Sequence, residues 1–188
     1  MEAVGTATKE VYEGIEKIIP EIFIWKEGEE KLSESRYAKY IFTVVKPPEK
    51  PFPIPRRILE QREKGNYIES TWMFALDDRV AEGAFYTNCV WLWEKKGTGD
   101  LEMEIAHTHD FDETLGFVGT VRHNPRELGG EIEFWLEDEK FLLTKSCLIY
   151  VPRGMKHLPL YIKRIDSPIF WWTAGNGTAY TRTSGNEF

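Results

Sequence analysis

Two of the four histidines in this chain stand one residue apart within an acidic segment. The segment reads HTHDFDE and runs from His107 to Glu113. Imidazole nitrogens and carboxylate oxygens are ligands that divalent transition metals accept. The segment is therefore either a polar turn between strands or a large part of a metal's coordination shell.

The run LEMEIAHTH (residues 101–109) indicates which way these two histidines point. Side chains alternate between the two faces of a strand. His107 and His109 share their parity with the apolar residues of the run, and this face must point to the core. We expect both rings to lie inside the fold, close enough to share one ion.

A third imidazole follows a turn signal further along the chain. A strand-like run ends at Pro152-Arg153-Gly154, and His157 comes three residues later. Proline and glycine favour a tight turn, which would fix where the next strand begins. We expect His157 to open onto the same interior.

Three acids and one more histidine compete for a role at this site. Glu113 begins a strand beside the histidines and is the preferred carboxylate ligand. Asp110 and Asp112 are expected to cap or solvate the turn that precedes it. His123 lies in a turn-like segment and is interpreted as a surface histidine.

Together these residues resemble the two motifs of the cupin family. The first motif is His-x-His, three or four residues, glutamate and a later glycine, matched here by His107, His109, Glu113 and Gly119. The second is Pro-x-Gly-x-x-His, matched from Pro152 to His157. The resemblance implies that His107, His109, Glu113 and His157 bind one divalent metal inside a small barrel. Gly119 stands one residue earlier than in the family, and Ser146 replaces a usual glycine, which affects turns rather than ligands.

The elements around the motifs indicate an all-β domain. From about residue 70, short apolar or alternating runs are separated by turn-like segments, as in sandwiches and barrels. With the resemblance, we expect a double-stranded β-helix, the cupin or jelly-roll barrel, over residues 70–175. Residues 1–69 would form an extension packed on the barrel, and residues 176–188 a loosely packed polar tail.

The extension carries several signals of its own. Helical spacing of apolar residues predicts a short helix before Pro20, and RYAKYIFTVV (residues 36–45) predicts a strand. Five of the ten prolines fall in KPPEKPFPIP (residues 46–55), which must run extended. The run RRILEQREKG (residues 56–65) predicts a helix that stops at a glycine.

Composition excludes several classes of protein. A net charge of -7 disfavours a nucleic-acid or anionic-membrane binder, and no apolar run is long enough to span a membrane. No signal-peptide layout opens the chain, so a cytoplasmic protein is expected. Cys89 and Cys147 are interpreted as free buried thiols, with one disulfide as the alternative. The family resemblance implies a homodimer.

Three imidazoles and one carboxylate suit Fe, Mn, Ni, Co or Zn as a divalent ion. A metal that prefers six ligands would keep two positions for water, O₂ or a small-molecule substrate. We expect an enzyme acting on a small oxygenated substrate, most often a dioxygenase-type oxidoreductase in this family. The alternatives are a redox-neutral isomerase, lyase or hydrolase, or a non-catalytic binding protein. Candidate substrate contacts are Tyr86, Arg153 and Trp172, for which core packing or solvation is the competing interpretation.

Overall fold

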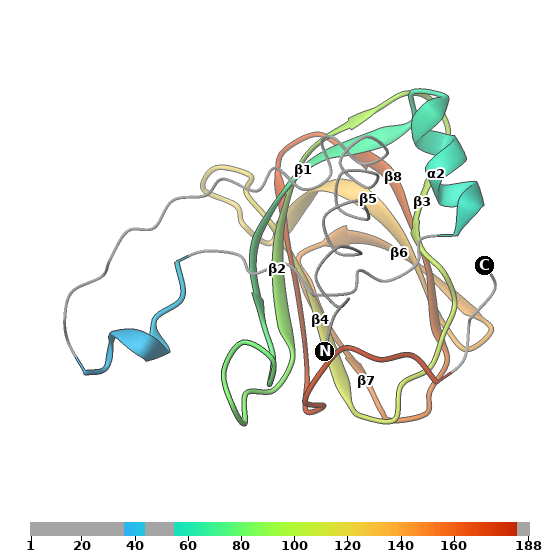
Figure 1. The fold of residues 1–188 in the computed structure, drawn as a ribbon. Coiled ribbons are helices and arrows are strands. Elements are labelled where there is room, and N and C mark those ends of the chain that lie inside the picture. Colours follow the sequence, from blue (N-terminus) through green and yellow to red (C-terminus); the bar gives the residue numbers. More distant parts are fainter. Residues whose placement is uncertain (1–35, 44–54, 184–188) are drawn as a thin grey trace, which may run out of the picture.

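The computed structural model describes residues 36–43 and 55–183 of the chain (Figure 1). Within these ranges it contains nine β-strands, one α-helix and one 3-10 helix. The helix expected before Pro20 and residues 46–54 of the proline-rich arm lie outside the described residues. Whether residues 1–69 form one extension packed on the barrel therefore stays a prediction.

The nine strands form two antiparallel sheets that enclose the core. The five-stranded sheet has the order β1 (Tyr67–Leu76), β2 (Thr87–Lys96), β9 (Ile169–Gly175), β4 (Glu113–Gly119), β7 (Cys147–Val151). The four-stranded sheet has the order β3 (Leu101–Glu104), β8 (His157–Ile165), β5 (Glu127–Leu136), β6 (Glu139–Lys145). From β2 onward every strand changes sheet except across the β5–β6 hairpin, so the expected jelly-roll fold is confirmed.

Strand alternation explains how the core fills. Along β4 the residues Glu113, Leu115 and Phe117 are buried, whereas Val118 is 41% exposed. The same period of two recurs on the facing sheet, where Ile132 of β5 is fully buried. Apolar side chains from both sheets therefore meet in one interior, and Glu113 enters that interior as the first residue of its strand.

The helix predicted over residues 56–65 is confirmed as α2 (Arg56–Glu63). Gly65 follows it with φ of +79°, a left-handed conformation that favours glycine. The helix packs on β3 through Arg57, whose Nε and Nη2 donate to the Glu102 carboxylate at 3.0 and 3.1 Å. Gln61 also exchanges two hydrogen bonds with the backbone of Glu102. This cover leaves Glu102 only 8% exposed, although it faces away from the core.

The strand predicted over residues 36–45 is wrong for the part that the structure describes. Ala38–Tyr40 form a 3-10 helix, closed by hydrogen bonds from Tyr40 N to Tyr37 O and from Ile41 N to Ala38 O, each 3.0 Å. Tyr37, Tyr40 and Ile41 are more than half exposed. Aromatic and β-branched residues favour a strand only where a neighbouring strand pairs with them, and residues 36–43 pair with none that the structure describes.

The run 101–109 is not one continuous strand. β3 ends at Glu104, after a register shift between Glu102 and Glu104 in its pairing with β8. Strand-like pairing resumes only at His107, which forms an isolated antiparallel bridge with His157. The inward direction predicted for His107 and His109 nevertheless holds, since they are 1% and 2% exposed.

Two further expectations concern cysteines and membranes. Cys89 and Cys147 are free thiols, as expected, so the disulfide alternative is wrong, but both are only partly buried rather than buried. Cys147 pairs with the buried Phe117 and Cys89 with Trp172 on the opposite face of the same sheet. None of the helices in the described ranges has the length and hydropathy needed to cross a membrane.

Candidate metal centre

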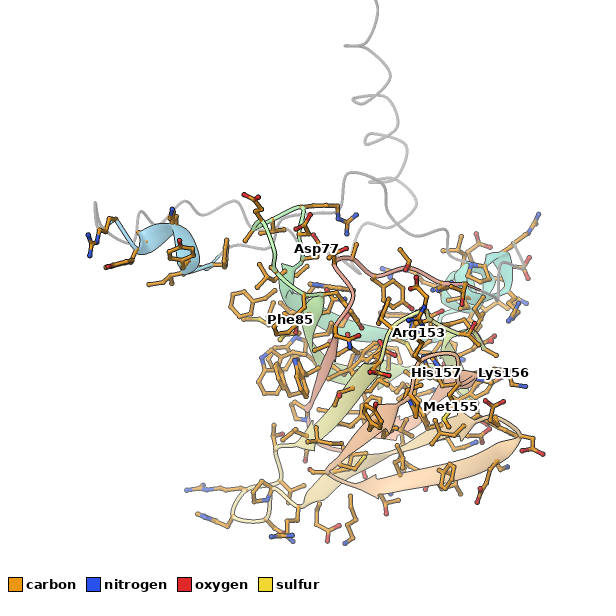
Figure 2. The ribbon with its side chains drawn as sticks, turned by 90° about the horizontal axis from the view of Figure 1, so that it is seen from below. Asp77, Phe85, Arg153, Met155, Lys156 and His157 are labelled. Carbon is orange, nitrogen blue, oxygen red and sulfur yellow. The ribbon has the colours of Figure 1, made fainter. Side chains whose placement is uncertain are left out.

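Three imidazole rings meet in the interior at one end of the barrel. His107 and His109 come from the segment after β3, and His157 is the first residue of β8. Their ring centroids are 4.5 to 5.0 Å apart, and one nitrogen of each lies within 4.8 Å of the others. Figure 2 shows His157 beside Met155 and Lys156, where the turn from β7 leads into β8.

Backbone carbonyls set the orientation of these rings. The Nδ1 atoms of His107 and His157 lie 2.8 and 3.2 Å from the carbonyl oxygens of Ile105 and Met155. Because a carbonyl oxygen only accepts, each Nδ1 carries the hydrogen and each Nε2 presents a lone pair. The turn before His157 contributes to this placement, since Met155 N donates to Pro152 O at 3.0 Å.

Glu113 completes the cluster from the start of β4. Its Oε2 lies 3.0 Å from His157 Nε2 and 3.5 Å from His109 Nε2. Its Oε1 accepts a hydrogen bond of 2.5 Å from the Tyr86 hydroxyl, which holds the carboxylate in place. Tyr86 is 2% exposed and therefore belongs to the centre as the partner of Glu113.

The protonation states of the cluster suit a cation. Burial by itself would raise the pKa of Glu113, but hydrogen bonds and positive charge from His109 and His157, in the metal-free state in which their Nε2 atoms carry hydrogens, lower it to about 2. Burial, followed by the neighbouring His157 and His109, lowers the pKa of His107 to about 3. At neutral pH the centre thus contains a carboxylate beside a neutral His107 ring.

Unpaired polar atoms test whether a metal fits these residues. Within the described part of the chain, Glu113 Oε2 and His157 Nε2 are buried without a hydrogen-bond partner. They face each other at 3.0 Å, and both present lone pairs when His157 carries its hydrogen on Nδ1. A buried polar atom without a partner costs roughly 1–3 kcal/mol, which a cation between the two atoms would offset. The donor set therefore fits a divalent metal.

The two aspartates and the arginine considered in the sequence analysis lie in turns outside the histidine cluster. Asp112 accepts hydrogen bonds from Arg153 N and from Asn176, and Asp110 is exposed, so both are turn residues as expected. Arg153 is exposed in the turn before β8.

The predicted role of Trp172 as a substrate contact disagrees with its position: it pairs with Gly116 on the outer face, away from the histidines. Its neighbour Thr173 takes the inward position, because side chains alternate along β9.

Residues 176–183 differ from the expected loose tail. Thr183 N donates to Thr108 O at 2.9 Å, so this segment runs alongside the histidine segment. Thr181 O accepts a hydrogen bond of 2.5 Å from His109 Nδ1 and fixes that ring as other carbonyls fix the first two. The Tyr180 hydroxyl lies 3.1 Å from His107 Nε2.

Sequence reasoning missed this contact because it joins segments more than seventy residues apart. One signal was present in the glycines that precede Tyr180. A Cβ at Gly175 or Gly177 would lie 2.6 Å from the ring of Phe111, so glycine lets the chain pass closely over this ring. Phe111 in turn stacks on His109, with ring centroids 4.6 Å apart.

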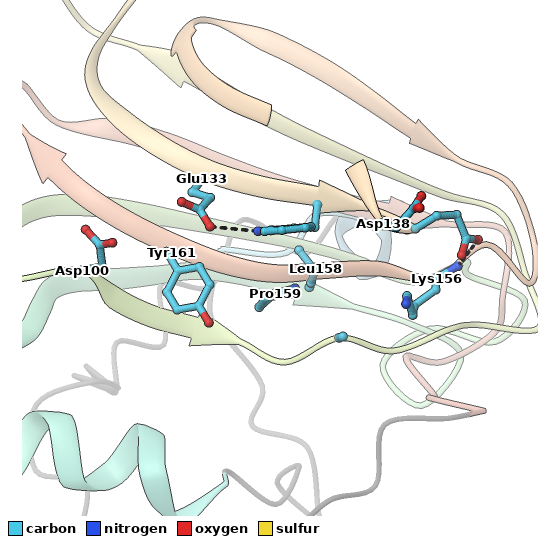
Figure 3. A pocket seen from close by; sticks show the side chains of 10 residues that line it. Asp100, Glu133, Asp138, Lys156, Leu158, Pro159 and Tyr161 are labelled. Carbon is cyan, nitrogen blue, oxygen red and sulfur yellow. Dashed lines mark hydrogen bonds between the residues drawn. The ribbon is translucent and has the colours of Figure 1, made fainter. Parts of the chain in front are cut away.

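A hollow lies on the outer side of the four-stranded sheet (Figure 3). It has a volume of about 620 Å³, and Glu133, Trp135 and Tyr161 are among the residues that line it. Trp135 Nε1 donates to Glu133 Oε1 at 2.9 Å, and Lys163 also pairs with this carboxylate. The three histidines do not line this hollow.

No family model matches the sequence, and no curated protein is similar enough in sequence to count as a relative. Among solved structures, KdgF from Halomonas sp. is 17% identical over 57% of this chain and 77% of its own, with a TM-score of 0.33. The DMSP lyase DddQ from Ruegeria pomeroyi DSS-3 is 19% identical over 50% of this chain and 39% of its own (TM-score 0.31).

Oxalate decarboxylase from Bacillus subtilis is 19% identical over 75% of this chain, with a TM-score of 0.40, and this chain covers 34% of it. The names of these neighbours include a lyase and a decarboxylase, so the likeness assigns no reaction to this chain. The strand order and the burial of the histidines are properties of this chain's own structure and do not depend on these neighbours. The strand order by itself shows a jelly-roll barrel, and three histidines that could hold a metal ion cluster inside it.

Proposed function

We propose that this protein is a metal-dependent enzyme that acts on a small oxygenated molecule. His107, His109, His157 and Glu113 hold one divalent transition metal, and the substrate binds through two oxygen atoms. The reaction proposed is an oxidation of the dioxygenase type, in line with the family that the motifs resemble. The observation that carries the proposal is the pair of unpaired atoms, His157 Nε2 and Glu113 Oε2, facing each other at 3.0 Å.

The residues around the cluster prepare it for this role. Backbone carbonyls hold the rings of His107 and His157 with Nε2 directed at one point. Tyr86 holds Glu113 by a hydrogen bond, and Phe111 covers one face of His109. When bound, the metal supplies Lewis acidity and, if it is redox-active, a site for O₂. The three histidines are at most 2% exposed, so bulk water has little access to the cluster.

Metal content tests the first part of the proposal. Protein isolated without added metal or chelator should contain close to one divalent transition metal ion per chain, by elemental analysis. His109→Ala should lose most of it, because one ligand nitrogen disappears. The matched control is His123→Asn, since His123 is exposed and has a φ of 63° that asparagine tolerates. Full metal content in His109→Ala would contradict the assignment.

Oxygen uptake tests the reaction type. Protein reconstituted with Fe(II) should consume O₂ in proportion to the loss of substrate when it is screened against small diols and enols. The His109→Ala variant provides the background rate. Loss of substrate without oxygen uptake would overturn the dioxygenase assignment and favour Lewis-acid chemistry. Saturable binding of a ligand without turnover would overturn catalysis.

A further inference from the structure

The two oxygen atoms of the Glu113 carboxylate lie in different surroundings. Oε2 lies 3.5 and 3.0 Å from the Nε2 atoms of His109 and His157. Oε1 instead accepts the hydrogen bond of 2.5 Å from the Tyr86 hydroxyl. A carboxylate can bind a metal ion through one oxygen or through both. The difference between the two oxygens therefore bears on how Glu113 would bind a metal.

Tyr86 is held in place by its backbone and by its ring. Its N–H donates to Gly177 O at 2.9 Å, and its carbonyl oxygen accepts from Gly175 N at 3.0 Å. The ring packs beside those of Phe111 and Tyr180, with centroids 5.8 and 5.3 Å away. Tyr86 is only 2% exposed, and a closely packed interior leaves a ring of this size little freedom. Its hydroxyl therefore has a fixed place beside the carboxylate.

The direction of the hydrogen bond follows from the two groups that form it. An ionised carboxylate only accepts, so the Tyr86 hydroxyl is the donor. Hydrogen bonds to a charged oxygen are shorter and stronger than those to a neutral oxygen. The bond thus favours the orientation of Glu113 in which Oε1 points to Tyr86 and Oε2 points to the rings.

We propose that Tyr86 makes Glu113 bind the metal through Oε2 alone, and thereby keeps two positions open for the two oxygen atoms of the substrate. A metal that prefers six ligands and takes one atom from each of the four ligand side chains has two positions left. The inference rests on the proposed function, because it concerns the metal that these side chains would hold. Tyr86 acts through Glu113 and is therefore a positioning residue.

Removal of the Tyr86 hydroxyl should change how Glu113 binds. Oε1 would then be a buried polar atom without a partner, which is unfavourable. A metal that binds both oxygens of the carboxylate satisfies this atom again, at the cost of one open position. In Tyr86→Phe we therefore expect Glu113 to bind through both oxygens. Phenylalanine keeps the ring and its packing, so the change is confined to the hydroxyl.

Water molecules bound to the metal count its open positions. Electron–nuclear double resonance of the full chain, loaded with Mn(II) in oxygen-17-enriched water, should find two metal-bound waters in wild type and one in Tyr86→Phe. The control Tyr150→Phe, which removes the hydroxyl of a tyrosine that is 60% exposed, should keep two. One water in wild type would overturn the inference however the variant folds. Two waters in Tyr86→Phe would contradict the role of the hydroxyl.

Two anions of equal charge test whether the open positions serve a chelating ligand. Azide and acetohydroxamate both bind metals as monoanions, azide through one atom and acetohydroxamate through two oxygens. In optical titrations of Co(II)-loaded protein, Tyr86→Phe should weaken acetohydroxamate at least ~10-fold, because the second contact of the same molecule is lost. Azide should change by less than ~3-fold. General damage to the site would weaken both anions, so equal losses would contradict the inference.

Metal content distinguishes failure of this inference from failure of the proposed function. Tyr86→Phe should retain close to one metal ion per chain, since all four ligand side chains remain. If wild-type protein holds the metal but Tyr86→Phe loses it, Tyr86 serves metal retention rather than the number of open positions, and the inference fails alone. If wild-type protein binds no divalent metal, the proposed function fails with it.

Discussion

At the scale of single residues, the main feature is an unfavourable contact that a cation would make favourable. His157 Nε2 and Glu113 Oε2 face each other at 3.0 Å inside the barrel, and neither has a hydrogen-bond partner within the described residues. The position of Glu113 is imposed by Tyr86, so the carboxylate cannot simply turn away. We infer that the interior favours metal binding at the expense of the metal-free state.

Substitution of the carboxylate tests this inference. Glu113→Gln should lower the affinity for divalent metal by at least ~10-fold, because a neutral amide replaces an anionic ligand. Asp110→Asn should change the affinity little, since Asp110 is exposed in the turn. Competition with a chromophoric chelator would measure both affinities. A loss of affinity in Asp110→Asn but not in Glu113→Gln would assign the carboxylate ligand to Asp110 instead.

At the scale of elements, close backbone approaches decide where β4 and β5 meet. A Cβ on Gly119, at the end of β4, would lie 2.0 Å from Glu127 O and 2.6 Å from Leu128 O. These are backbone atoms at the start of β5, so they cannot move without disturbing the pairing of that strand. The N–H of Gly119 donates a hydrogen bond of 2.8 Å to the Ser146 hydroxyl, which also holds this end of β4 in place.

Gly119→Ala should therefore lower the free energy of unfolding by about 2 kcal/mol or more, through overpacking. Gly116→Ala is the control in the same strand, because its Cβ would meet side-chain atoms of Leu148 and Trp172 at 2.9 and 3.0 Å. Those side chains lie on the outer face and can shift, so the loss should be smaller. Urea denaturation of both variants would measure the difference, and equal losses would contradict this explanation.

At the scale of the whole molecule, burial of the ring cluster couples folding to pH. The folded-state pKa of His107 is about 3, below the value of about 6.5 for an exposed histidine. Between these values the unfolded chain binds a proton that the folded chain does not, so stability falls as pH decreases. Glu113, whose pKa is lowered to about 2, adds to the loss only below pH ~4.5.

Metal-free protein should accordingly lose about 2 kcal/mol of unfolding free energy between pH 6.5 and pH 4.5. Urea denaturation at a series of pH values would measure this loss. His107→Gln should flatten the dependence in this window, whereas the exposed His123→Asn should not. A stability that does not change between these pH values would contradict the lowered pKa of His107.

The outer face of the five-stranded sheet bears on the expected homodimer, which stays a prediction. Trp93, Val118, Leu148 and Tyr150 are 41% to 68% exposed there. Two copies could bury these exposed apolar side chains against each other. Sedimentation should find a dimer in the wild type and a monomer in Leu148→Lys. The control Leu142→Lys, at an exposed position on the other sheet, should remain a dimer. A monomeric wild type would contradict the prediction.

The sequence alone determined the inward direction of His107 and His109, the turn before His157 and the all-β fold. These features follow from local rules: side chains alternate along a strand, and proline with glycine favours a tight turn. Another local rule, that a glycine stops a helix, predicted α2, which ends at Glu63 shortly before Gly65.

Only the tertiary structure decided which segments cover the site. Residues 36–43 depart from a strand because no described strand pairs with them, and Trp172 faces outward because Thr173 takes the inward position. The contact of Tyr180 with His107 joins segments 73 residues apart, and no local pattern encodes such a contact. Free energy gained by packing distant segments together is a property of the folded chain, so this contact could be found only once the fold was known.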